Sequence, residues 1–83
     1  MEYKVVKNNS DDFWEDNKDN SFGLGKEITI RFDKNKVSIE SQGKDVYLQR
    51  EEKRAKVSTE GQVIKGVVKN GDKLFLDDEV VIE

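Results

Sequence analysis

The chain has 83 residues with no cysteine and no histidine, which excludes disulfides, thiolate nucleophiles, imidazole bases and most structural zinc sites. Its net charge of −3 comes from 15 basic and 18 acidic residues, so the chain as a whole lacks the basic character of a typical nucleic-acid-binding protein. It contains no apolar run of about 18 residues, so we expect no contact with the membrane interior.

The length suits one domain, and we expect residues 1–83 to share a single hydrophobic core. Ten valines against one alanine, together with the absence of proline, favour strands over helices. Within the domain we expect an N-terminal strand, short helix and loop over 1–25, a β-meander over 26–59, and a hairpin with a last strand over 60–83. Without cysteine or a secretion signal, we expect a cytoplasmic protein.

The N-terminal part has three predicted elements. Residues 2–7 alternate weakly between apolar and polar types and predict a strand. Asp12 followed by Glu15 is typical of a capping box, which predicts one or two helical turns ending near Lys18. The turn-forming residues of 17–25 predict a loop.

The meander begins with two runs, 27–32 and 37–40, in which apolar residues alternate strictly with polar ones. Turns at 33–36 and 41–44 would fold three strands against one another with their apolar side chains on one face. The pairs predicted across these turns are Phe32 with Val37, Ile30 with Ile39, Ile39 with Val46, and Val37 with Leu48.

The segment 50–54 is densely charged, and its residues favour a helix while the residues after it alternate like a strand. We interpret it as a charged turn or short helix that leads into a strand. The final elements are a hairpin and a last strand, Val80 to Ile82, with Asp77-Asp78 at the bend between them.

The hairpin is predicted from Asn70-Gly71, because both residues adopt positive φ easily and a two-residue type I′ turn needs this. The flanking residues 63–68 and 73–76 are mostly β-branched or bulky. The predicted cross-strand pairs are Lys69 with Asp72, Val68 with Lys73, Val67 with Leu74, and Gly66 with Phe75. Altogether we expect a mostly β fold: a small antiparallel meander closing into a barrel or sandwich of six to eight short strands, with at most one short helix near 12–18.

The segment 61–83, with its Val68-to-Leu74 hairpin, resembles the first half of a biotinyl/lipoyl domain. The likeness covers only these residues, since the first sixty have no counterpart in that family. We interpret it as shared hairpin chemistry, and it implies no cofactor.

A dense acidic and aromatic stretch is the first candidate site. One interpretation is that the aromatic residues Phe13, Trp14 and Phe22 cap the core. The other is that they are exposed anchors within an acidic docking patch for a basic protein partner. The predicted contact residues are Asp11, Asp12, Phe13, Trp14, Glu15, Asp16 and Asp19.

These features predict a non-enzymatic acidic protein-binding module, of the kind found among small phage or mobile-element regulators and inhibitors. The carboxylates do not fit a calcium loop starting at Asp16, because Lys18 and Ser21 occupy positions that need acidic or glycine residues. We therefore expect no metal, no cofactor and no catalytic residues.

Two alternatives come from other parts of the chain. A small barrel could bind nucleic acid through its basic residues and one stacking ring, although the acidic balance favours a protein partner. The residues of this alternative site are Arg31, Tyr47, Arg50, Lys53, Arg54 and Lys56. A structural or oligomerising role is the second alternative, because Val80 to Ile82 could form an exposed edge strand that pairs with a second copy.

Overall fold

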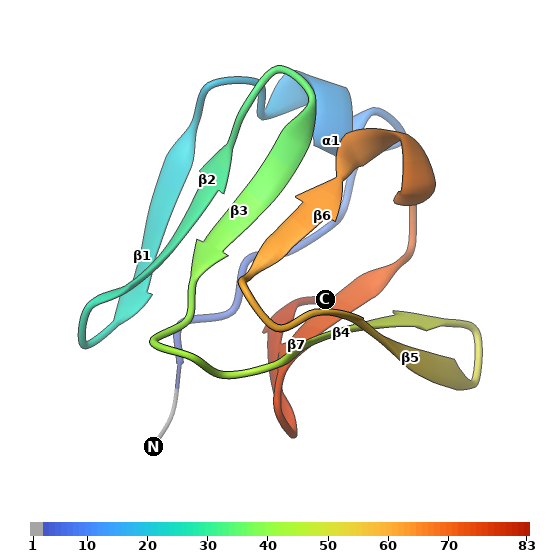
Figure 1. Cartoon of the computed structure of the whole chain (residues 1–83). Helices are drawn as coiled ribbons and strands as arrows, with labels where there is room; N and C mark the ends of the chain where they lie inside the picture. The colour runs from blue at the N-terminus through green and yellow to red at the C-terminus, as the bar shows by residue number, and fades with distance from the viewer. Residues whose placement is uncertain (1–2) are drawn as a thin grey trace.

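The computed structural model describes residues 3–83 and arranges their strands in two antiparallel four-stranded sheets (Figure 1). The elements are α1 Phe13–Asp16, β1 Ser21–Gly25, β2 Ile28–Phe32, β3 Lys36–Glu40, β4 Val46–Arg50, β5 Lys53–Ser58, β6 Gln62–Ile64, the 3-10 turn η1 Lys65–Val67, β7 Lys73–Leu76 and β8 Glu79–Ile82. This confirms the predicted mostly β fold with its single short helix. Neither sheet closes on itself within residues 3–83, so the predicted closure into a barrel is not observed there.

The first sheet has the strand order β1-β2-β3-β6. In β2, the side chains of Ile28, Ile30 and Phe32 are buried while those between them face outward, as strict alternation requires. The predicted register between β2 and β3 is confirmed, with Phe32 opposite Val37 and Ile30 opposite Ile39.

The loop predicted over 17–25 is wrong in its second half, because β1 pairs with β2 there. Leu24 is buried and Phe22 packs edge-on against Phe32, with ring centroids 5.8 Å apart. The glycines mark an irregular register between Gly23 and Gly25. Tertiary pairing with β2 therefore outweighs the turn preference of these residues.

The second sheet has the order β5-β4-β7-β8, and it corrects the predicted meander. Val46 and Leu48 do not lie beside Ile39 and Val37, because β4 sits between β5 and β7 while β3 pairs with β6. The alternation of apolar and polar residues determines which face of a strand is buried, but it does not determine which strand pairs with it. The turn after β3 therefore leads the chain out of the first sheet and into the second.

The predicted hairpin around Asn70-Gly71 is also wrong. β6 pairs with β3, η1 follows it, and β7 pairs with β4 and β8. A turn does form, with the Asp72 N–H donating to the Lys69 carbonyl at 3.0 Å, but of its two central residues only Gly71 has positive φ. This is the pattern of a type II turn, and it does not impose a two-residue hairpin.

The likeness to a biotinyl/lipoyl domain depended on that hairpin, so it does not extend to the fold. In the ambiguous segment, the charged-turn interpretation is confirmed: Glu51 and Glu52 form a turn and β5 begins at Lys53.

The N-terminal segment contributes no full strand among residues 3–9, and residue 2 of the predicted strand lies outside the described range. Val6 forms a parallel bridge to Ile82. Its N–H donates to the Val81 carbonyl and its carbonyl accepts from the Glu83 N–H, both at 2.9 Å. This segment covers the outer edge of β8, so the predicted open edge at 80–82 is wrong.

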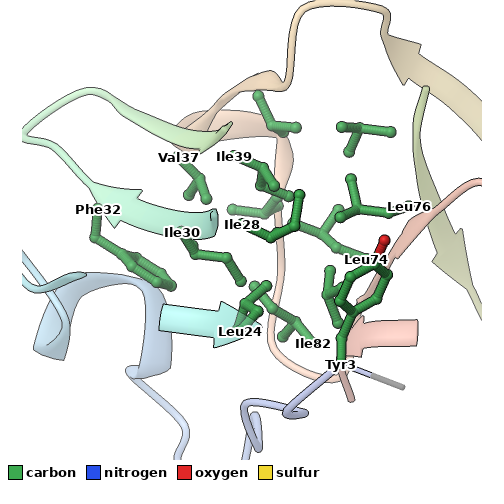
Figure 2. Packing of buried hydrophobic residues seen from close by; sticks show 14 of the residues in the cluster. Tyr3, Leu24, Ile28, Ile30, Phe32, Val37, Ile39, Leu74, Leu76 and Ile82 are labelled. Atoms are coloured by element: carbon green, nitrogen blue, oxygen red, sulfur yellow. The ribbon is translucent and has the colours of Figure 1, made fainter. Parts of the chain in front are cut away.

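One hydrophobic core lies between the two sheets and includes side chains from both (Figure 2). Val37 and Ile39 enter it from the first sheet, and Leu74 and Ile82 enter it from the second. Leu48 packs at its margin. Within residues 3–83, no helix has the length and apolar character needed to span a bilayer.

Candidate functional site

The aromatic residues of the N-terminal stretch belong to the core. Phe13 is 4% exposed and Trp14 6% exposed. The Phe13 ring meets the rings of Trp14 and Phe32 edge-on at 4.9 and 5.6 Å. Trp14 Nε1 also donates a hydrogen bond to the Lys69 carbonyl at 3.1 Å. Of the two interpretations, the structure supports the core cap and leaves no exposed aromatic anchor at Phe13 or Trp14.

The carboxylates around these rings face solvent. We call this set the acidic surface: Asp11, Asp12, Glu15, Asp16 and Asp19. The predicted capping box is wrong, since Asp12 makes no side-chain cap bond to α1, which spans only four residues. None of the five takes part in an ion pair with another residue of the described chain. Their role in partner binding stays a prediction.

The six residues of the alternative nucleic-acid site do not form one surface. Arg31 lies on β2 in the other sheet, where its Nε contacts Glu40 Oε1 at 2.9 Å. Arg50 is paired with Asp72: its Nε and Nη2 donate hydrogen bonds to the two carboxylate oxygens at 2.9 and 2.7 Å. Lys53 is opposite Arg50 and therefore points to the same side of the sheet.

The other three residues of that site do share a face. Tyr47 on β4 is opposite Lys56 on β5, and Arg54 is opposite Gln49. Since side chains two residues apart lie on one side of a strand, Tyr47, Arg54 and Lys56 all project from the outer side of the second sheet. The core-facing side of β4 carries Val46.

Sequence reasoning missed three further residues on this face: Gln49 on β4, and Lys73 and Phe75 on β7. β7 places Phe75 directly opposite Tyr47 and Lys73 opposite Gln49. The alternation of residues 73–76 already indicated this orientation for the two β7 residues. If Leu74 and Leu76 are buried, Lys73 and Phe75 must face outward. The incorrect hairpin register placed Phe75 over Gly66 instead.

We define the sheet face as Tyr47, Gln49, Arg54, Lys56, Lys73 and Phe75. Its centre is a stack: the Arg54 guanidinium lies over the Phe75 ring, with its carbon 3.8 Å from the ring centroid. Arg54 is steadied by Gln49 Oε1 at 3.4 Å and by Asp78 at 3.9 Å. Tyr47 and Phe75 are half-buried, and Arg54 and Lys56 are exposed.

The Arg50–Asp72 pair lies at one end of β4. Asp72 is 2% exposed and also accepts a hydrogen bond from the Lys69 N–H at 2.8 Å. Burial by itself raises the pKa of Asp72, but the Arg50 guanidinium and the Lys69 N–H outweigh it and hold the pKa below its ordinary value. This pair fixes the turn before β7 and so helps to position Lys73 and Phe75.

Residues 3–83 contain no group of three carboxylates that converges as metal ligands would. Comparison with protein-family models, with curated proteins and with solved structures found no match. The chemistry of its surfaces is therefore the basis for any functional conclusion about this protein.

Proposed function

We propose that this protein is a non-enzymatic, cytoplasmic binding module whose sheet face binds single-stranded nucleic acid. The observation that carries the proposal is the placement of Tyr47 and Phe75 directly opposite each other on adjacent central strands, with Arg54 stacked on Phe75. Antiparallel sheets with aromatic side chains on neighbouring strands are a common platform for stacking unpaired bases.

The two aromatic positions offer different surfaces to a base. Tyr47 offers its own ring, and Arg54 offers a guanidinium that lies over the Phe75 ring. Bases stack on guanidinium planes as well as on rings. Because the Arg54 guanidinium already lies over the Phe75 ring, less side-chain entropy is lost when a base stacks on it.

The sheet face carries positive charge although the chain as a whole is acidic. Lys56 and Lys73 lie on the strands that flank β4, one on each side, where they can attract phosphates. The net charge of −3 opposes this attraction over longer distances. We therefore expect weak binding that falls steeply as salt is added.

The test is fluorescence anisotropy of a labelled oligothymidine of roughly ten nucleotides, titrated with protein at low salt and then at rising salt. Arg54→Ala should weaken binding by between about fivefold and a hundredfold, since stacking is worth about 1–3 kcal/mol per base. Tyr47→Leu should act in the same direction while keeping apolar bulk on the sheet.

The matched control is Arg31→Ala. Arg31, like Arg54, is an exposed arginine within a strand that contacts a carboxylate, but it lies on the other sheet. The Arg31→Ala variant should bind oligothymidine with the same affinity as the wild type. Absence of wild-type binding at low salt, or equal losses in Arg54→Ala and Arg31→Ala, would overturn the proposal.

The acidic surface supports a second candidate function, docking of a basic protein. The specific observation is that all five carboxylates are exposed and none is neutralised by an ion pair within residues 3–83. Because Phe13 and Trp14 are buried, this docking depends on electrostatic attraction between the carboxylates and basic groups of the partner. A phage- or mobile-element-type regulator or inhibitor would use such a surface.

This candidate is tested by affinity capture from a cell lysate with the wild type and with an Asp11→Asn/Asp12→Asn/Glu15→Gln variant. A true partner is lost with that variant and retained with Asp77→Asn/Asp78→Asn, which removes exposed carboxylates elsewhere. Capture that is equal for both variants would dismiss the acidic surface.

A further inference from the structure

The strand β5 is the longest in residues 3–83, at six residues, yet it adds no side chain to the hydrophobic core. Residues 53–57 are exposed, and only Ser58 is half-buried. Most antiparallel sheets in small domains bury one face of each strand. The core therefore does not account for β5, and what this strand supplies to the molecule is an edge.

This edge is open along the margin of the second sheet (Figure 1). β5 pairs with β4 alone, and no main-chain hydrogen bond joins it to any other segment of residues 3–83. The edges of β1 and β8 differ, because Lys4 donates to the Leu24 carbonyl and Val6 donates to the Val81 carbonyl. β6 offers only a three-residue edge. Among the described residues, β5 therefore has the longest uncovered edge.

The main-chain groups of β5 alternate in direction. Arg50 and Lys53 flank the two-residue turn Glu51-Glu52, and residues in that position hydrogen-bond to each other. Bonded and non-bonded pairs alternate along an antiparallel ladder, so the N–H and C=O groups of Arg54 and Lys56 point away from β4. A register shift ends the regular pattern after Lys56. We call residues 53–56 the β5 edge.

The two ends of the β5 edge carry lysines on opposite sides of the sheet. Lys56 lies on the sheet face, and Lys53 projects from the other side. Neither forms an ion pair with another residue of the described chain. Arg54 differs, because its guanidinium lies over the Phe75 ring, across β4. A strand added here therefore meets one unpaired ammonium group at each end.

We propose that the β5 edge binds an extended, acidic segment of a partner protein, which adds to the second sheet as a further antiparallel strand. Main-chain hydrogen bonds to Arg54 and Lys56 hold the segment, and its side chains determine specificity. Carboxylates of the segment lie opposite Lys53 and Lys56. The positions between them suit β-branched residues, which favour extended backbone. The matching segment therefore reads acidic, β-branched, β-branched, acidic.

A second copy of this chain fits the β5 edge less well. Pairing β5 with β5 of another copy brings together lysines and arginines without one acidic side chain in either strand. Like charges across a strand pair are destabilising, and lysine on an exposed edge is a common device against self-association. The same lysines attract an acidic strand, so charge selects between these two occupants.

The experiment is an amide-resolved NMR titration of the full chain at low salt with a capped peptide of about ten residues centred on Glu-Val-Thr-Glu. Binding should shift the amides of Arg54 and Lys56 and slow their exchange with solvent. The same peptide centred on Gln-Val-Thr-Gln should bind about fivefold more weakly, because it lacks both carboxylates.

Methylated peptides separate strand pairing from charge attraction. In the antiparallel register the threonine N–H faces β5 and the valine N–H faces solvent. Methylation of the threonine nitrogen should abolish binding, and methylation of the valine nitrogen should preserve it. Both peptides retain the carboxylates, so a difference between them measures main-chain pairing.

Protein variants test the same edge from the other side. Lys56→Pro removes an outward N–H and should abolish binding, whereas Lys56→Gln removes only the charge and should weaken binding about threefold. Lys34→Gln, at an exposed lysine in the turn between β2 and β3, is the matched control and should bind the peptide like the wild type.

The proposal does not rest on nucleic-acid binding at the sheet face, although Lys56 belongs to both surfaces. Lys53→Gln should weaken peptide binding and leave oligothymidine binding unchanged. Tyr47→Leu should weaken oligothymidine binding and leave peptide binding unchanged. Failure of one function is therefore distinguishable from failure of the other.

The strand-addition proposal is overturned if no peptide binds at about 1 mM, if the glutamate and glutamine peptides bind equally, or if both methylated peptides bind alike. Analytical ultracentrifugation of the protein alone tests the other occupant. A dimer in which the Arg54 and Lys56 amides are protected from exchange would show that a second copy covers the edge, which also overturns the proposal.

Discussion

The Arg50 guanidinium donates two hydrogen bonds, of 2.9 and 2.7 Å, to the buried carboxylate of Asp72. Arg50 also donates to the Val67 carbonyl at 2.8 Å. One side chain at the end of β4 therefore ties down both η1 and the turn before β7. This contact holds the chain where it passes from the first sheet to the second, and it stands in place of the hairpin that the sequence predicts.

Asp72→Asn should lower the free energy of unfolding by about 2 kcal/mol, because it removes the charge from a two-pronged pair and weakens the bond to the Lys69 N–H. Urea denaturation followed by circular dichroism measures this. Asp78→Asn is the control: its carboxylate is fully exposed and lies 3.9 Å from Arg54, so we expect a change within about 0.5 kcal/mol. Equal effects would contradict a structural role for the pair.

The Asp72 carboxylate should also make the free energy of unfolding depend on pH in the acid range. Since the folded protein holds the pKa of Asp72 below its ordinary value, the unfolded chain binds the proton first as the pH falls. The stabilisation is complete above the ordinary aspartate pKa of about 3.9 and is lost as the pH falls through the lower folded-state pKa. Unfolding curves measured between about pH 6 and pH 2 should show this loss in the wild type. Asp72→Asn should show a smaller loss, and identical profiles would contradict the assignment.

Gly61→Ala should destabilise the fold by at least about 2 kcal/mol. Gly61 has φ of +76°, and a Cβ there would clash with the Ile39 carbonyl oxygen. The backbone also approaches closely, because the Ile39 N–H donates to the Gly61 carbonyl. Thermal melting measures the effect. Gly66→Ala is the control, since a Cβ there meets nothing within 4 Å, and a comparable loss in both variants would argue against this close approach.

Trp14→Ala should cost about 3–5 kcal/mol of stability, since it empties a large buried site beside Phe13 and Phe32. Trp14 is the only tryptophan, so its fluorescence in the wild type should be blue-shifted in the folded protein and should shift red on unfolding. Trp14→Phe, which retains an aromatic ring but loses the bond to the Lys69 carbonyl, should cost less. An exposed, red-shifted emission in the folded protein would contradict the burial of this ring.

By itself, the sequence determined the local features of this protein. Period-two alternation placed Ile28, Ile30 and Phe32 on one buried side of a strand, and the short turn after them gave the correct register with Val37 and Ile39. These predictions succeeded because side-chain direction in a strand, and pairing across a short turn, depend on neighbouring residues only.

Only the tertiary structure decided which strands lie side by side. Val46 has the same alternation beside β3 as beside β7, and Asn70-Gly71 suits a type II turn as well as a hairpin. The choice between them depends on contacts across long sequence separations, such as Arg50 with Asp72 and Trp14 with the Lys69 carbonyl. Strand pairing of the same long-range kind places Phe75 opposite Tyr47, so the proposed sheet face depends on contacts that no local pattern specifies.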